Sequence, residues 1–113
     1  MPFTNHPDAP DNRGCTPIHY AAEYGQLKTV QFLVGLTDTP LAPEIIGDTP
    51  IHYAAFNGNL EIVQFLVNFT NTPNAPNNFG NIPISSAALY GNLEVVQFLA
   101  NFTNTPNAPD NGG

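Results

Sequence analysis

Two histidines in this chain, His19 and His52, could act as metal ligands or as acid–base groups, because imidazole serves in both roles. Each follows a threonine by three residues in a matching segment, Thr16-Pro17-Ile18-His19 or Thr49-Pro50-Ile51-His52. Each histidine therefore falls at the third position of an expected helix whose N-cap is the threonine. We interpret both as structural braces rather than as catalytic or metal-binding groups.

His6 is the remaining candidate metal ligand, because Asp8 and Asp11 lie close to it in the sequence. A zinc site needs a third well-placed ligand, and the sequence has no cluster with zinc-ligand spacing. A metal-binding protein is therefore only the remote alternative, and we expect no cofactor.

Three further residues, Cys15, Glu61 and Glu94, carry side chains that serve in many active sites. Cys15 follows Gly14 at the position that Asp48 and Asn81 occupy in the other units, so we expect an exposed thiol. A nucleophilic cysteine needs an adjacent base, which Arg13 cannot supply, so no catalytic role is expected. Glu61 and Glu94 recur in the first turn of an expected helix, where negative charge is favourable. With no phosphate loop and no Ser-His-Asp motif, the chain is not expected to be an enzyme.

The charge balance excludes several classes of partner. Nine acidic residues and two basic ones give a formal net charge of −7 over 113 residues, which repels nucleic acid and anionic membranes. The longest apolar runs are far shorter than the ~20 residues of a membrane helix. The single cysteine cannot form an internal disulfide, so a reducing compartment such as the cytoplasm is compatible with the chain.

The elements that position these residues repeat with a fixed period. Four glycines recur every 33 residues: Gly14, Gly47, Gly80 and Gly113. The segment Thr16-Pro17-Ile18-His19-Tyr20-Ala21-Ala22 recurs at 49–55 and, more loosely, at 82–88. The period predicts one domain over 1–113, with an N-terminal connector at 1–14 and units at about 15–47, 48–80 and 81–113.

Each unit is expected to contain two helices. A threonine N-cap, a proline at the first helical position and a glycine after the paired alanines delimit a first helix of about two turns. A second helix opens at Gln26, Asn59 or Asn92. In the middle unit, residues 60–67 carry apolar side chains on more than one face, as a helix buried from both sides requires. The proline-rich connectors exclude helix and end in a projecting turn.

The 33-residue period, the Thr-Pro-Ile-His-Tyr-Ala-Ala segments and the Gly-Asn-Leu-Glu-Ile-Val-Gln-Phe-Leu segments together resemble the ankyrin repeat. The resemblance covers essentially the whole chain. It implies an all-α solenoid of stacked antiparallel helix pairs with projecting hairpin-like turns. It also implies non-covalent protein binding as the usual activity.

The chain departs from the family pattern in three respects. The connector has Phe-Thr-Asn-Thr-Pro at 69–73, where the family usually has a Gly-Ala-Asp-Val-like stretch. The third unit has Ile82 and Ser85 in place of threonine and histidine, so its brace is absent and its cap is weaker by about 1 kcal/mol. Residues 3–14 match 102–113 without polar capping repeats, so we expect an excerpt of a longer array or an engineered one.

Positions that differ between units are informative, because structural positions repeat and binding positions need not. They fall at the turn tips and at the end of the first helix: Asn12, Arg13, Cys15, Glu23 and Tyr24; Ile45, Ile46, Asp48, Phe56 and Asn57; and Asn78, Phe79, Asn81, Leu89 and Tyr90. The candidate protein interface consists of Arg13, Tyr24, Ile45, Ile46, Asp48, Phe56, Phe79, Asn81, Ile82, Leu89 and Tyr90. Its aromatic residues are the expected anchors.

An apolar patch is expected within this interface. Leu41, Ile45 and Ile46 stand in the middle connector where the other connectors are mostly polar. Stacking of the units is expected to bring further apolar side chains close to them: Phe56, Phe79, Ile82 and Leu89. For Leu41 and Ile82, burial between adjacent connectors is the alternative.

Two functions follow from these features. The first is a non-catalytic scaffold that binds another protein through its turn tips and inner-helix face. The alternative is a symmetric homo-oligomer, natural or designed, that forms through the apolar patch around Ile45 and Ile46. The expected partner is therefore another protein or another copy of the chain.

Overall fold

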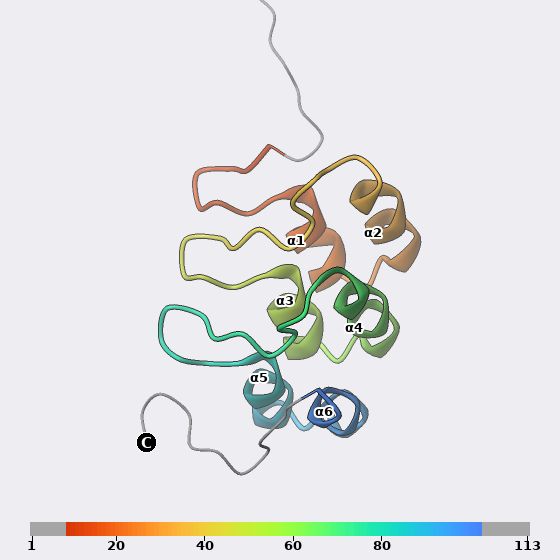
Figure 1. The fold of residues 1–113 in the computed structure, drawn as a ribbon, viewed down its shortest axis with the longest axis vertical. Coiled ribbons are helices and arrows are strands. Elements are labelled where there is room, and N and C mark those ends of the chain that lie inside the picture. The colour runs from red at the N-terminus through yellow and green to blue at the C-terminus, as the bar shows by residue number, and fades with distance from the viewer. Residues whose placement is uncertain (1–8, 103–113) are drawn as a thin grey trace, which may run out of the picture.

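The computed structural model describes residues 9–102, and within this range the regular elements are helices, with no strand (Figure 1). They form three pairs in chain order: α1 (Pro17–Glu23) with α2 (Leu27–Val34), α3 (Pro50–Phe56) with α4 (Leu60–Leu66), and α5 (Pro83–Leu89) with α6 (Leu93–Ala100). A short 3-10 turn, η1 (Val67–Phe69), extends α4. The predicted all-α stack of helix pairs is confirmed.

The first helix of each pair begins and ends where the sequence predicts. The N-cap residues Thr16, Thr49 and Ile82 have extended backbone, and a proline follows each of them. The glycine after each helix, for example Gly58 at φ +74°, takes the left-handed conformation that an L side chain disfavours. Its N–H donates back to a carbonyl of the last helical turn, so the helix stops there.

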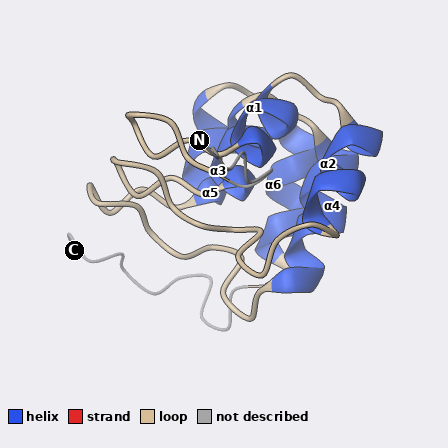
Figure 2. Ribbon diagram, turned by 90° about the horizontal axis from the view of Figure 1, so that it is seen from above, coloured by secondary structure: helices blue, strands red, loops and turns tan. Residues whose placement is uncertain are grey.

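The helices form two columns, and the connectors project from one of them. Helices α1, α3 and α5 form the inner column, and α2, α4 and α6 form the outer one (Figures 1 and 2). The hairpins project on the inner side, and neighbouring hairpins are joined by backbone hydrogen bonds. The Ile45 N–H donates to the Arg13 carbonyl at 2.8 Å, and the Asn78 N–H donates to the Ile46 carbonyl at 2.8 Å.

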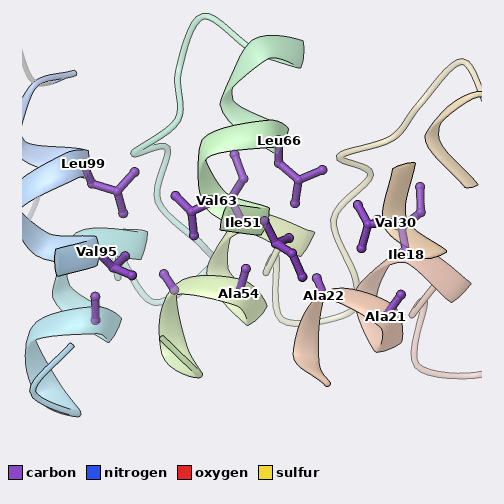
Figure 3. Close-up of a cluster of buried hydrophobic side chains, with 13 residues drawn as sticks. Ile18, Ala21, Ala22, Val30, Ile51, Ala54, Val63, Leu66, Val95 and Leu99 are labelled. Atoms are coloured by element: carbon purple, nitrogen blue, oxygen red, sulfur yellow. The ribbon is translucent and has the colours of Figure 1, made fainter. Parts of the chain in front are cut away.

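The core lies between successive pairs as well as within them (Figure 3). Ala22 and Val30 of the first pair are fully buried, as are Ala55 and Val63 at the same positions of the second pair. The small alanine side chains let α1, α3 and α5 pack closely, while the longer aliphatic side chains fill the space toward the outer column.

One asparagine joins the second pair to the first, and another joins the third pair to the second. The Asn59 side-chain amide donates to the Ala22 carbonyl at 2.7 Å, and the Asn92 amide donates to the Ala55 carbonyl at 2.9 Å. These carbonyls belong to the last turn of the preceding inner helix, where helical partners are missing. The asparagine that opens α4 or α6 thus also fixes the position of the preceding pair.

Candidate protein interface

The histidines position the hairpins relative to the helices. The backbone N–H of Thr16 donates to Nδ1 of His19 at 3.0 Å, and Nε2 of His19 lies 2.9 Å from the carbonyl oxygen of Asp48 in the next hairpin. His52 repeats this arrangement with Thr49 at 3.0 Å and with the carbonyl of Asn81 at 3.1 Å. Both histidines are therefore braces between units, as predicted.

These contacts fix the protonation state of the two rings. Because a backbone N–H points at Nδ1, that nitrogen accepts, and Nε2 carries the proton that it donates to the next hairpin. Burial lowers the pKa of His19 and of His52, although nearby carbonyl and carboxylate groups oppose the shift. The neutral ring suits the site, because a second ring proton would face the threonine N–H.

A side-chain acceptor at one repeated position shapes each turn. Oδ1 of Asp11 accepts from the N–H groups of Arg13 and Cys15, both at 2.9 Å. The same pair of bonds forms at the second hairpin, where Oε1 of Glu44 is the acceptor, and at the third, where Oδ1 of Asn77 is the acceptor. Each turn tip is thus held from inside, and its side chains face outward on a fixed backbone.

Glu44 and Tyr53 form a polar contact beneath the second hairpin. The Tyr53 hydroxyl donates to Oε2 of Glu44 at 3.0 Å. Burial raises the pKa of the Glu44 carboxyl, but the N–H groups of Asp48 and Ile46 and the Tyr53 hydroxyl outweigh it and hold the pKa below its usual value. Burial is also the main cause that raises the pKa of Tyr53. The pair therefore stays as a charged carboxylate and a neutral phenol at physiological pH.

The expectation that Cys15 is exposed is wrong. Its side chain is 1% exposed, and its sulfur lies 3.3 Å from the Tyr53 hydroxyl and 3.8 Å from Nη2 of Arg13. The equivalent residues Asp48 and Asn81 are half-buried and exposed, so their polarity was a misleading guide to the first unit. Cys15 is covered because Tyr53 of the second unit reaches back over it.

A hollow of about 390 Å³ opens where the first two hairpins meet the inner helices. Five residues of the predicted interface line it: Arg13, Tyr24, Ile46, Asp48 and Phe56. The lining also includes Tyr53 and Glu44 as well as Glu23, so the hollow combines apolar and aromatic surface with three carboxylates and one guanidinium.

The other predicted interface residues lie around this hollow. The Tyr90 ring is 4.3 Å from the Phe56 ring, centroid to centroid, so it extends the aromatic surface onto the third unit. Ile45, Phe79 and Leu89 are exposed and do not line the hollow. Two other residues of the predicted interface have structural roles. The half-buried Ile82 is the N-cap of α5, and Asn81 donates its backbone N–H to Oδ1 of Asn77. Leu41 packs against the core.

Two kinds of functional residue were not identified from the sequence. The first is the hydrogen-bond acceptor inside each turn. Asp11, Glu44 and Asn77 recur every 33 residues, and each supplies a side-chain oxygen that accepts from the turn backbone. The second is the tyrosine in the inner helix. The hydroxyl of Tyr20 donates to Asp11 as that of Tyr53 does to Glu44, and this bond raises the pKa of Tyr20 to about 12. The shared period was the signal for both.

The described part of the chain, residues 9–102, contains no group of three or more His, Cys, Asp or Glu side chains that could hold a metal ion. His6 and Asp8 lie outside the described residues, so the metal alternative built on them stays a prediction. None of the helices in the described range is long and apolar enough to cross a membrane.

The stacked helix pairs and braced hairpins define a helical repeat protein of the solenoid class. The family model for "Ankyrin repeats (3 copies)" matches residues 35–110, and the model for a single "Ankyrin repeat" matches residues 13–42. The chain belongs to the ankyrin-repeat family. Ankyrin repeats generally mediate protein–protein interaction and are generally non-catalytic. No curated protein matches the chain.

Proposed function

We propose that this chain binds another protein through the surface formed by its hairpin tips and inner helices. The hollow between the first two units carries the proposal, because aromatic and aliphatic side chains surround it on a backbone braced by His19 and His52. Exposed aromatic residues on a rigid frame are typical of binding hot spots, since little side-chain entropy is lost when they are covered.

The charges around the hollow indicate the chemistry of the partner. Glu23 and Asp48 line it, and the chain as a whole has a formal net charge of −7. Arg13 is the only basic residue in the lining. We therefore infer that the partner presents an apolar side chain flanked by lysine or arginine, which the field of the chain would attract.

Photo-crosslinking from defined positions tests this proposal. A photoreactive phenylalanine analogue is introduced in place of Phe56, at the hollow, or in place of Phe32, which is 68% exposed on the outer helix α2. Both chains are irradiated in an extract of cells that produce the protein. We expect a discrete protein adduct from position 56 and none from position 32. Equal adducts from both positions, or none from position 56, would contradict the proposal.

A second candidate function is self-association through the tip of the second hairpin. Ile45 is 66% exposed and Ile46 is 40% exposed, and a pair of exposed isoleucines on a turn favours burial against a matching surface. Light scattering coupled to size-exclusion chromatography on the parent and on Ile45→Asn/Ile46→Asn tests it. A parent oligomer that the double variant dissociates supports this candidate, and a monomeric parent or an unchanged oligomer rejects it.

A further inference from the structure

Three carboxylates line the hollow between the first two units, and the fold already uses two of them. Oε1 of Glu44 accepts from two N–H groups of its own turn, and Oε2 accepts from the Tyr53 hydroxyl. Oδ1 of Asp48 accepts from the side-chain amide of Asn77 at 2.8 Å and lies 3.9 Å from Nε2 of His52. Both carboxylates therefore hold the hairpins in place.

Glu23 carries the third carboxylate, and this group has no partner in the described part of the fold. Glu23 is the last residue of α1 and lies half-buried in the wall of the hollow. Among residues 9–102, no hydrogen bond or ion pair involves its carboxylate. Both of its oxygens are therefore able to accept hydrogen bonds from a bound molecule.

The charge of Glu23 also acts against its own helix. A negative charge at the C-terminal end of a helix is repelled by the helix dipole. The same position holds Phe56 at the end of α3 and Leu89 at the end of α5, so the repeat does not require an acid there. A charged residue that disfavours its helix and has no partner inside the fold is typical of a functional position.

Aromatic rings line the hollow together with this carboxylate. Tyr24 follows Glu23 directly and is 70% exposed, and Phe56, at the matching position of α3, is 44% exposed. The lining as a whole is negative, because three carboxylates face one guanidinium and burial keeps His52 neutral. Exposed rings beside an unpaired carboxylate favour a cation that has a flat, weakly hydrated surface.

We propose that Glu23 determines the specificity of this hollow by binding an arginine side chain of the partner against the rings of Tyr24 and Phe56. This inference rests on the proposed function and names the group that the hollow receives. A guanidinium donates two parallel N–H bonds to one carboxylate, which requires both oxygens to be unoccupied, and it stacks on aromatic rings. A volume of about 390 Å³ is at the small end of the range for ligand sites, which suits one long side chain.

Arginine suits this site better than lysine does. The lysine ammonium is a compact, strongly hydrated charge without the planar fork that pairs with both oxygens of a carboxylate. The chain's own Arg13 does not take this place, because its Nη2 lies 3.8 Å from Sγ of Cys15 and no ion pair within residues 9–102 joins it to Glu23. The position beside Glu23 is therefore open to a guanidinium from the partner.

Short peptides test this preference without the natural partner. Acetyl-Leu-Arg-amide, acetyl-Leu-Lys-amide and acetyl-Leu-citrulline-amide are each titrated into the isotope-labelled full chain and followed by NMR. Citrulline keeps the shape of arginine without its charge. We expect the arginine peptide to shift the amide signals of Glu23, Tyr24 and Phe56, and to bind about threefold more tightly than the lysine peptide and about tenfold more tightly than the citrulline peptide. Equal affinity for the arginine peptide and either of the others overturns the proposal, as does the absence of shifts at these residues.

Glu23→Gln and the matched control Glu61→Gln locate the effect. Both variants remove one negative charge, but Glu61 is exposed in the first turn of α4 and is not part of the lining. We expect Glu23→Gln to bind the arginine peptide about tenfold more weakly and to lose the preference over the citrulline peptide. Glu61→Gln should bind like the parent. An unchanged affinity in Glu23→Gln, or an equal loss in both variants, overturns the proposal.

Thermal unfolding of the same variants separates binding from a structural role. Removal of the Glu23 charge relieves its repulsion by the α1 dipole, whereas removal of the Glu61 charge loses a favourable interaction with the α4 dipole. We therefore expect the Tm of Glu23→Gln to equal or exceed that of the parent, and the Tm of Glu61→Gln to lie slightly below it. A lower Tm for Glu23→Gln than for Glu61→Gln would mean that this carboxylate supports the fold, and it overturns the proposal.

The protein captured through position 56 distinguishes this inference from the proposed function. If its Kd rises about tenfold in Glu23→Gln, both are supported. If it binds Glu23→Gln as tightly as the parent, the proposed function stands and this inference fails. If position 56 captures no protein, the proposed function fails, and the peptide titrations decide whether Glu23 binds arginine.

Discussion

At the scale of single residues, the same side chain works within its own unit and across to the next one. His19 and His52 each hold the threonine that caps their own helix, and each reaches a carbonyl of the following hairpin. Asn59 and Asn92 do the same in the opposite direction, from the start of an outer helix to the end of the preceding inner one. Such residues couple the folding of a unit to the presence of its neighbour.

The chain is expected to become less stable as the pH falls, because of its two buried histidines. Burial holds their pKa values in the folded chain below the ordinary 6.5, so the unfolded chain binds more protons below that pH. The stabilisation is complete above pH 6.5 and is lost as the pH falls through the folded values. Urea unfolding at pH 7.5 and 5.5 should show a less stable chain at pH 5.5, with a smaller difference in His52→Gln. Equal stability at the two pH values would contradict this. Glu44 does not contribute to this difference, because its pKa is held below 4.5 and its carboxylate stays charged at both pH values.

Removal of one bridging amide should destabilise the whole chain. Asn59→Ala leaves the Ala22 carbonyl without its side-chain donor at a buried contact between units, and we expect a loss of about 1–2 kcal/mol. Asn68→Ala is the control, because Asn68 is exposed and donates only to carbonyls of the preceding turn, and it should cost less than about 0.5 kcal/mol. Urea unfolding monitored by circular dichroism measures both, and equal losses would argue against a bridging role.

At the scale of elements, the ends of the helices were predictable from the sequence, whereas the burial of some side chains was not. Threonine caps, prolines and glycines act locally, so the sequence places the ends of α1, α3 and α5 well. The burial of Cys15 depends on Tyr53, which lies 38 residues further along the chain. No local pattern carries that information. The hollow escaped prediction for the same reason, because its lining comes from several units.

Two glycines at the same position of different helices separate backbone strain from crowding. Gly58 and Gly91 have φ values of +74° and +71°, so alanine is disfavoured equally by the backbone at both. A Cβ at Gly58 also displaces Asn92 from its hydrogen bonds to α3, whereas a Cβ at Gly91 meets nothing. We expect Gly91→Ala to cost about 1 kcal/mol and Gly58→Ala about 1–2 kcal/mol more. Equal losses in thermal unfolding would show that the asparagine contact contributes little.

At the scale of the whole molecule, the described units are unequal because their neighbours are unequal. Within residues 9–102, the middle pair packs between the first and third pairs, whereas the third pair packs against the middle pair alone. The third pair also lacks a capping side chain at Ile82 and a histidine brace at Ser85. Among the described residues, it is therefore stabilised by one interface between units rather than two.

Hydrogen exchange in dilute solution should follow this order. We expect backbone amides in α3 and α4 to exchange most slowly and those in α5 to exchange faster, because α5 opens without breaking the contacts between the first two pairs. Mass spectrometry of peptides from the three units measures this. Slowest exchange in α5 would contradict the expected dependence on neighbours.

We expect the hairpins and inner helices to act as one rigid binding surface, and a binding titration measures the contribution of its residues. The protein captured through position 56 is purified and titrated by calorimetry into the parent, Phe56→Ala and Phe32→Ala. Both residues are exposed phenylalanines, but Phe56 alone lines the hollow. We predict that Kd rises about tenfold or more for Phe56→Ala, a loss of about 1.4 kcal/mol, and less than about twofold for Phe32→Ala. A larger loss for Phe32→Ala, or equal affinities for all three chains, would show that the partner does not bind at the hollow.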